Sequence, residues 1–210
     1  ITVNPRGDAI VMAGGKWLNF WEGSESEIVS ENRLIWNRDI ISGDQLALAI
    51  SDDGSTIVIG SDNNIIYVVD RNGSLLWTNT TGYWVRSVAV TSKGEYILAG
   101  SFDSHLYIFD RSGNSLSTFP ADRPIRAIAL SPDESLLVIA TDEVVTGFKN
   151  WKEDLSRDSG EWQNSGMVAI NSAEGTDQGG PSETQAPLTL LISMSAIVVV
   201  GAYIGLPERE

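Results

Sequence analysis

The sequence contains no cysteine and a single histidine, His105, among its 210 residues. The absence of cysteine excludes disulfides and thiolate metal sites, and a histidine-based zinc site or a Ser-His-Asp triad would have to use His105. Basic residues are also scarce, because 14 Lys and Arg stand against 28 Asp and Glu, for a formal net charge of −14. An acidic surface repels phosphate backbones, so we expect no nucleic-acid partner.

A convincing helical period is also missing before residue 185. Instead, residues 50–77 and 90–117 repeat each other with a constant offset of 40 residues. In these two copies Gly54 falls on Gly94, and Asp70 falls on Asp110. A period near 40 with turn glycines at fixed places is typical of a four-stranded propeller blade.

The repeat extends in both directions along the chain. A copy from residue 130 keeps the offset of 40, and a copy from residue 3 matches the one from residue 50 at an offset of 47, because a longer polar loop intervenes. We therefore predict an all-β fold, a β-propeller with about four blades over residues 1–150. Propellers typically close with about four to eight blades, and the chain begins inside a predicted inner strand, so we expect these blades to belong to a larger ring with further blades upstream.

Residues 67–77, which read YVVDRNGSLLW, resemble the repeat of pyrroloquinoline-quinone-type propellers. In that family an aspartate, a turn glycine and a tryptophan four residues later dock neighbouring blades. The Ser-Pro-Asp turn at 131–133 and the strands with a Tyr-x-x-Asp end also resemble WD-repeat proteins. Ser117 stands where the next docking tryptophan is expected, so we expect a weaker junction there. The resemblance covers roughly residues 1–150 and implies blade-docking roles for Trp36, Asp70, Gly73, Trp77, Asp110 and Gly113.

Two segments at the entrances of predicted inner strands contain the candidate ligand-binding residues, Trp84, Arg86, Arg123 and Arg126. Segment 83–86 aligns with 123–126 at the offset of 40, and both place an arginine just inside the strand. In propellers these entrances surround the mouth of the central channel, where aromatic and guanidinium groups can hold a carboxylate, a sugar or a peptide. The alternative is that Arg86 and Arg126 pair with aspartates of adjacent turns and only fasten blades.

The sequence predicts no catalytic residues, no metal site and no cofactor. It does contain two N-glycosylation sequons, which begin at Asn72 and Asn79. They lie at a predicted hairpin and at the end of a predicted outer strand. Both are candidate glycan acceptors if this face lies outside the cell.

Beyond the blades the composition changes twice. Residues 151–186 are rich in polar residues and glycine and read as a flexible stalk, with a strand expected at 167–170. Residues 187–206 are predicted to form a transmembrane helix, because 188–206 carry no charge and would span roughly 28 Å as a helix. The short tail 207–210 holds the only nearby base, which places it in the cytoplasm and the propeller outside.

The predicted span has two further features. Two glycines, Gly201 and Gly205, have the small-xxx-small spacing that allows helix pairing, and so a helix-mediated homodimer. The span also resembles the C-terminal anchors of prokaryotic, particularly archaeal, surface proteins.

We therefore expect a single-pass membrane protein whose propeller is a non-catalytic binding or scaffolding module at the cell surface. Its ligand is expected to be a protein or a glycan at the propeller face. Two alternatives stay open: a fragment of a quinoprotein-type dehydrogenase, which the resemblance implies, and an assembly factor that presents strand edges or a channel mouth to other envelope proteins. Fold similarity alone does not assign an activity.

Overall fold

The computed structural model describes residues 1–23, 34–155 and 168–171, which form sixteen strands and one short helix. The strands make four antiparallel sheets, each of four strands. The strands of blade 1 are β1 (Thr2–Val3), β2 (Ala9–Gly14), β3 (Trp17–Glu22) and β4 (Leu34–Asp39), and those of blade 2 are β5 (Gln45–Ile50), β6 (Thr56–Ser61), β7 (Ile65–Asp70) and β8 (Leu75–Thr80). Blade 3 has β9 (Val85–Val90), β10 (Tyr96–Ser101), β11 (His105–Asp110) and β12 (Ser115–Pro120), and blade 4 has β13 (Ala127–Leu130), β14 (Leu136–Ala140), β15 (Val144–Lys149) and β16 (Val168–Asn171).

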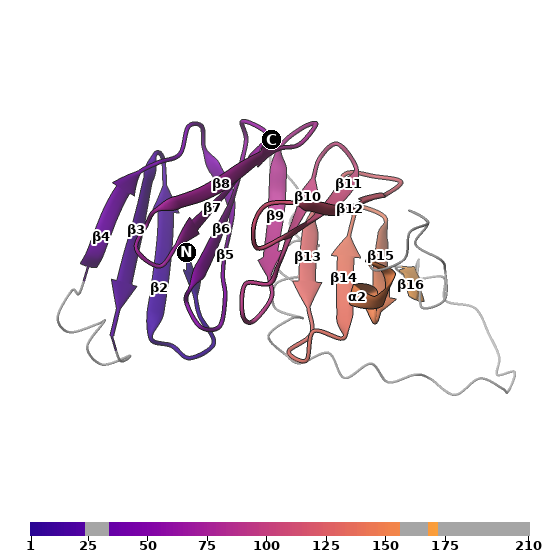
Figure 1. Ribbon diagram of the computed structural model, residues 1–210. Coiled ribbons are helices and arrows are strands. Elements are labelled where there is room, and N and C mark those ends of the chain that lie inside the picture. Colours follow the sequence, from indigo (N-terminus) through magenta and orange to yellow (C-terminus); the bar gives the residue numbers. More distant parts are fainter. Residues whose placement is uncertain (24–33, 156–167, 172–210) are drawn as a thin grey trace, which may run out of the picture.

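Each sheet pairs its strands in chain order, from an inner first strand to an outer fourth strand. Successive sheets stand side by side from indigo to orange (Figure 1). The prediction of an all-β fold is confirmed, and the four antiparallel sheets are consistent with part of a β-propeller.

The internal repeat is visible in the strand register as well as in the sequence. In blades 1, 2 and 3 the pairing of the third strand with the fourth shifts at the same repeat position, between Phe20 and Trp21, between Val68 and Val69, and between Ile108 and Phe109. Such a bulge adds local twist to the outer part of a sheet. Blades 1, 2 and 3 therefore share this register shift as well as the regular pairing of their strands.

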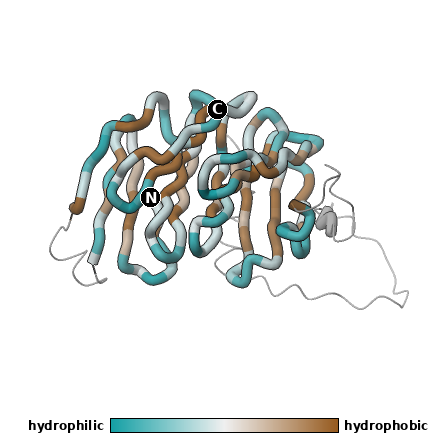
Figure 2. Tube along the Cα trace, in the orientation of Figure 1, coloured by the Kyte–Doolittle hydropathy of each residue, from teal (hydrophilic) through white to brown (hydrophobic). Residues whose placement is uncertain are grey.

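The hydrophobic core is divided into three clusters, one between each pair of neighbouring blades. Figure 2 shows that apolar residues concentrate in the strands and polar residues in the turns. Second-strand residues are apolar on both faces: Ile57 packs toward blade 1, whereas Val58 packs toward blade 3. A sheet with two apolar faces needs a cover on each side, and its neighbours in the ring provide one.

The packed part of the chain continues past residue 150, the predicted end of the blades. Helix α2 (Trp151–Asp154) follows β15 directly, and the Trp151 side chain is fully buried. A helix this short gives no hydrophobic period, which is why the sequence did not indicate it. Strand β16 pairs antiparallel with β15 and lies where a strand was expected at 167–170.

Within residues 1–23, 34–155 and 168–171, the structure contains no helix with the length and hydrophobicity that a membrane crossing needs. The predicted transmembrane helix at 187–206, the tail at 207–210 and most of the predicted stalk lie outside the described residues.

Candidate functional site

Two tryptophans hold blades 1, 2 and 3 together. The indole N–H of Trp36, in blade 1, donates to the Arg71 carbonyl of blade 2 at 2.8 Å, and the indole of Trp77 donates to the Arg111 carbonyl of blade 3 at 3.0 Å. Both rings lie against a turn glycine: a Cβ atom on Gly73 would be 3.0 Å from the Trp36 ring, and one on Gly113 would be 2.8 Å from the Trp77 ring. The close approach of ring to backbone requires glycine at both turns.

The aspartate before each of these turns holds the turn in shape. The Asp70 carboxylate accepts hydrogen bonds from the backbone N–H groups of Asn72 and Ser74, at 2.9 and 2.8 Å. Asp110 accepts the equivalent pair in blade 3, and an additional bond from the side chain of Asn114 helps to lower the pKa of the Asp110 carboxyl. These residues thus supply the turn that receives the neighbouring tryptophan.

The junction of blades 3 and 4 uses different aromatic residues. Ser117 stands at the tryptophan position, and Phe119 on the same strand meets Phe148 of blade 4 edge to face, with ring centroids 5.0 Å apart. In addition, Trp151 packs edge-on against Tyr96 of blade 3, at 5.5 Å. The aromatic contact that Ser117 cannot make is therefore provided by residues outside the repeat position.

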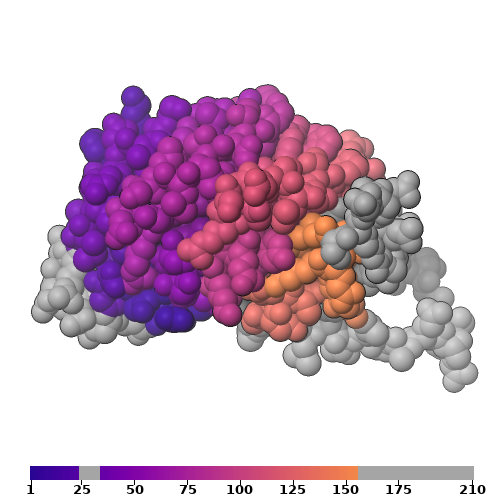
Figure 3. Space-filling view, viewed as in Figure 1, coloured from indigo at the N-terminus to yellow at the C-terminus, as the bar shows by residue number. Residues whose placement is uncertain are grey.

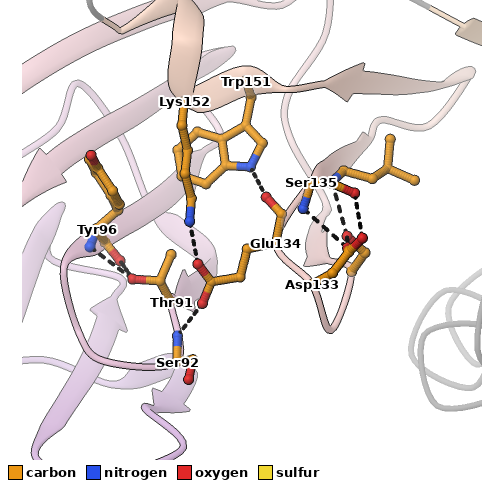
Figure 4. A network of polar contacts seen from close by, with 10 residues as sticks. Thr91, Ser92, Tyr96, Asp133, Glu134, Ser135, Trp151 and Lys152 are labelled. Atoms are coloured by element: carbon orange, nitrogen blue, oxygen red, sulfur yellow. Dashed lines mark hydrogen bonds and ion pairs between the residues drawn. The ribbon is translucent and has the colours of Figure 1, made fainter.

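Glu134 links these two blades through polar contacts (Figure 4). Its carboxylate accepts a 2.5 Å hydrogen bond from the backbone N–H of Ser92 in blade 3 and forms an ion pair with Lys152. Its own carbonyl accepts the indole N–H of Trp151 at 2.9 Å. Glu134 has a φ of +58°, at the turn position where blades 2 and 3 have Gly54 and Gly94. A non-glycine residue in this region is strained, and here the side chain gains an inter-blade contact that glycine cannot make.

Replacement of Glu134 by glycine is expected to destabilise the protein by about 1–2 kcal/mol, although glycine suits this backbone conformation better. The lost contacts to Ser92 and Lys152 outweigh the strain that is released, because the Glu134 side chain is largely buried. Urea unfolding of the wild type and of Glu134→Gly measures the difference. A variant more stable than the wild type would show that strain is the larger effect.

A second group of residues gathers at the entrance of the inner strands β9 and β13. We call Tyr83, Trp84, Arg86, Phe102 and Arg126 the rim cluster. The Tyr83 and Trp84 rings stack with centroids 5.2 Å apart, and Trp84 stacks in turn on Phe102 at 6.2 Å. The guanidinium groups of Arg86 and Arg126 lie over the Phe102 ring, at 5.4 and 4.4 Å from its centroid. The cluster is a row of aromatic rings flanked by two cations.

Hydrogen bonds fix the backbone of the loop that carries the two exposed rings. The Tyr83 carbonyl accepts from the hydroxyls of Thr81 and Ser101, at 2.6 and 3.0 Å. The Trp84 carbonyl accepts from the backbone N–H of Phe102 at 2.9 Å. Because Ser101 and Phe102 belong to strand β10 and the turn after it, these bonds anchor the backbone of the loop to the blade.

Asp103 also anchors this loop. Its carboxylate accepts the backbone N–H of Gly82 at 2.6 Å and the hydroxyl of Tyr107 at 2.7 Å. Burial of the Tyr107 phenol, reinforced by this bond to Asp103, raises the pKa of Tyr107 to about 12. The hydroxyl therefore stays protonated and keeps donating to Asp103 throughout the physiological pH range.

The three predicted arginines differ in their partners. Arg126 forms a bidentate pair with Asp142, at 2.6 and 2.9 Å, and these bonds hold the pKa of the Asp142 carboxyl below its usual value. Arg123 pairs with Glu143 at 2.9 Å and lies apart from the aromatic rings. Arg86 contacts Phe102 and has no carboxylate partner among the described residues. Among the described residues, the Arg86 guanidinium is therefore the cation of the rim cluster that has no carboxylate counter-charge.

The opposite ends of the inner strands surround a central groove of about 490 Å³. Its walls are aliphatic residues from β5, β9 and β13, including Leu48, Val90 and Leu130, and the turn residues Asp52 and Glu134 lie at its end. None of the described residues that line the groove is aromatic. It therefore lacks a surface on which a planar or cyclic ligand could stack, whereas the rim cluster has one.

Other sequence candidates have unremarkable surroundings. Asn72 is exposed on its hairpin, whereas the Asn79 amide donates to the Gly113 carbonyl at 3.0 Å. The His105 ring lies 2.9 Å from the Asp103 carbonyl. In the part of the chain that the structure describes, no group of three or more His, Cys, Asp and Glu side chains is placed to hold a metal ion.

Phe102 is the member of the rim cluster that the sequence reasoning missed. At the offset of 40 it aligns with Asp62, so a turn that is polar in blade 2 carries an aromatic ring in blade 3. An aromatic residue at a turn position that is polar in the preceding copy was the available signal.

Comparisons with known proteins agree with the propeller architecture. The family model of the lambda-carrageenase β-propeller domain matches residues 21–127, a segment that contains the whole rim cluster. A comparison with curated proteins gives no match. A solved structure of hydrazine synthase from Kuenenia stuttgartiensis superposes with a TM-score of 0.61 at 14% identity, over 72% of this chain and 46% of that one. This chain thus spans less than half of that chain's length, and at this identity the likeness shows the fold alone.

The finer resemblance to pyrroloquinoline-quinone-type or WD repeats remains a prediction. The match of the family model, in contrast, spans just over half of the 210 residues and includes blades 2 and 3 in full. The chain belongs to the lambda-carrageenase β-propeller domain family.

Proposed function

We propose that this β-propeller is a non-catalytic glycan-binding module and that its rim cluster holds a sulfate-bearing sugar. One observation carries the proposal: a stacked, exposed pair of rings, Tyr83 and Trp84, is fixed by hydrogen bonds beside an arginine without a carboxylate partner among the described residues. Such a site offers both an apolar surface and a positive charge to one ligand.

The aromatic rings suit the apolar faces of a sugar ring. Tyr83 and Trp84 are 47% and 38% exposed, although they lie in a tightly bonded loop. Exposed large aromatic side chains that are held in one arrangement are favourable contact surfaces, because little conformational entropy is lost when a ligand binds. A pyranose that stacks on them would bury apolar C–H groups against the indole.

The guanidinium of Arg86, which has no carboxylate partner within the described part of the chain, supports an anionic group on that sugar. Guanidinium binds planar or tetrahedral oxyanions through several N–H donors at once. The net charge of −14 weakens the long-range attraction of any polyanion, so binding of a sulfated sugar would depend on its local contact with Arg86. The name of the family supports the same class of ligand, because lambda-carrageenan is a sulfated galactan.

The cellular setting of this module is part of the proposal. The uncharged run at 188–206 and the polar segment before it support a single-pass anchor with the propeller outside the cell. A tethered glycan-binding domain would hold polysaccharide at the cell surface. Measurable turnover of a quinone-linked dehydrogenase substrate by the purified protein would contradict the non-catalytic part of the proposal.

Calorimetric titration with lambda-carrageenan oligosaccharides and their desulfated counterparts tests the binding. We expect the wild type to prefer the sulfated form by roughly tenfold, which is about 1.4 kcal/mol. Arg86→Gln is expected to lose this preference while it still binds the desulfated sugar, because the aromatic rings remain. Arg6→Gln, a change of an exposed arginine in the β1–β2 turn, is the matched control and should behave as the wild type. Equal losses in both variants would point to general charge effects.

A further inference from the structure

Blades 3 and 4 have an arginine at the same repeat position, but the turn residue that contacts it differs. At the offset of 40, Arg86 aligns with Arg126, and Phe102 aligns with Asp142. The strand register supports this alignment, because in both blades the residue after the arginine pairs with the residue two positions before the turn residue. The two blades can therefore be compared as two versions of one contact between an arginine and a turn.

In blade 4 the turn residue neutralises the arginine. The Asp142 carboxylate accepts hydrogen bonds from Nε and Nη2 of Arg126, at 2.6 and 2.9 Å. This is the bidentate geometry in which a guanidinium binds any oxyanion, so an internal carboxylate already occupies that edge of Arg126. A sulfate at Arg126 would have to displace this carboxylate and would be repelled by its charge.

In blade 3 the turn residue contacts the arginine without neutralising it. The Arg86 guanidinium carbon lies 5.4 Å from the centroid of the Phe102 ring. A guanidinium that packs face-on against a ring keeps the N–H donors of its edge for an oxyanion. The next residue, Asp103, directs its carboxylate to the backbone N–H of Gly82 and to the Tyr107 hydroxyl. Among the described residues, Arg86 thus keeps an uncompensated charge.

The two arginines lie close enough together to meet one ligand. Arg126 also lies over the Phe102 ring, at 4.4 Å, so both guanidinium carbons are within 5.4 Å of one centroid. Figure 3 shows the surface of blade 3, in magenta, continuing directly into that of blade 4, in salmon and orange. If Asp142 did not pair with Arg126, this part of the surface would present two available cations side by side.

We infer that the rim cluster holds a single anionic group, bound by Arg86, because Phe102 leaves this cation available whereas Asp142 neutralises Arg126. The inference rests on the proposed function and specifies it further, since it sets how many sulfates the ligand presents at the site. A sugar with one sulfate at Arg86 and hydroxyl groups toward the Arg126–Asp142 pair fits this arrangement, because the pair offers both N–H donors and carboxylate acceptors.

Inorganic sulfate counts the available guanidinium groups without any sugar. The Nε–H signals of Arg86 and Arg126 in a nitrogen–proton correlation spectrum of the full-length protein are assigned from their loss in Arg86→Lys and Arg126→Lys. On titration with sodium sulfate at constant ionic strength, the Arg86 signal should shift to saturation while the Arg126 signal stays unmoved. In Asp142→Asn, which frees Arg126, both signals should shift. An unmoved Arg86 signal or a shifting Arg126 signal in the wild type would overturn the inference.

The variant Phe102→Asp gives blade 3 the turn residue of blade 4 and should abolish the response of Arg86 to sulfate. Phe102→Leu removes the ring without adding a charge, so Arg86 should still respond. Glu143→Gln is the control for Asp142→Asn, because Glu143 pairs with Arg123 and its loss should leave the Arg126 signal unmoved. Circular dichroism verifies that the variants remain folded. Equal loss of the Arg86 response in both Phe102 variants would contradict the role assigned to the turn charge.

Sulfated oligosaccharides separate this inference from the proposed function. With a galactan oligosaccharide that carries adjacent sulfates, Asp142→Asn should raise the preference over the desulfated form from roughly tenfold to roughly a hundredfold. A wild-type preference that Asp142→Asn leaves unchanged would overturn the single-anion inference and leave glycan binding standing. A sulfate response confined to Arg86, without binding of any oligosaccharide, would support the single-anion inference and contradict the proposed function.

Discussion

Replacement of Trp151 by alanine is expected to lower the free energy of unfolding by about 3–5 kcal/mol, the largest stability effect that we predict for one side chain. Trp151 is fully buried although it lies beyond the last regular turn of the repeat. The change leaves a large cavity between α2 and blade 3, removes the edge contact with Tyr96, and leaves the Glu134 carbonyl without its indole donor. Urea unfolding followed by circular dichroism measures the loss.

Trp84→Ala is the matched control, because Trp84 is partly exposed and its backbone bonds do not need the ring. Its free energy of unfolding should change by less than about 1 kcal/mol. A Trp151→Ala variant with similarly small effect would mean that α2 is not part of the folded core of blade 4.

Trp84→Ala is in turn expected to cause the largest loss of binding. Removal of the indole takes away the centre of the aromatic row, since Trp84 stacks on both Tyr83 and Phe102. Truncation of a central aromatic residue at a binding surface costs about 2 kcal/mol or more, so we expect affinity for carrageenan oligosaccharides to fall at least tenfold. Calorimetry with the sulfated and desulfated sugars should show equal losses, because the change affects stacking and leaves Arg86 in place.

The variant Trp84→Phe tests whether a different aromatic ring at this position is enough for stacking. A phenyl ring keeps most of the stacking surface, so this variant should retain affinity within about threefold. Unchanged binding by Trp84→Ala would contradict the location of the site, whatever the affinity of the wild type.

Much of the fold could be predicted because a blade is a local unit. The period of 40 and the fixed turn glycines specify four strands and their order without any knowledge of distant contacts. The resemblance to pyrroloquinoline-quinone-type repeats further implied that tryptophans of neighbouring blades dock at Gly73 and Gly113. The sequence was less informative where the copies diverge: Glu134 takes the place of a turn glycine, and Trp151 packs onto blade 3 from outside the repeat. Neither contact follows from alignment within one sequence.

The candidate site was predictable only in part. Trp84, Arg86 and Arg126 come together at the rim, because the repeat places 84–86 and 126 at equivalent strand entrances. Arg123 lies three residues from Arg126 but pairs with Glu143 instead. Side-chain direction in a loop depends on the local backbone, which proximity in sequence does not specify. Phe102, the ring that both cations contact, comes from a different turn and needed the structure to be placed.

The proposal that the rim cluster is the glycan site is tested most directly by the indole N–H signals in a nitrogen–proton correlation spectrum. The chain has seven tryptophans, and the Trp84 signal is assigned from its loss in Trp84→Phe. On titration with a sulfated galactan oligosaccharide, the Trp84 signal should shift progressively to saturation. The signals of the docking residues Trp36 and Trp77 should keep their chemical shifts, because their indole N–H groups are hydrogen-bonded to backbone carbonyls of the neighbouring blades. A saturable shift elsewhere with the Trp84 signal unmoved, or no shift at all, would contradict the account.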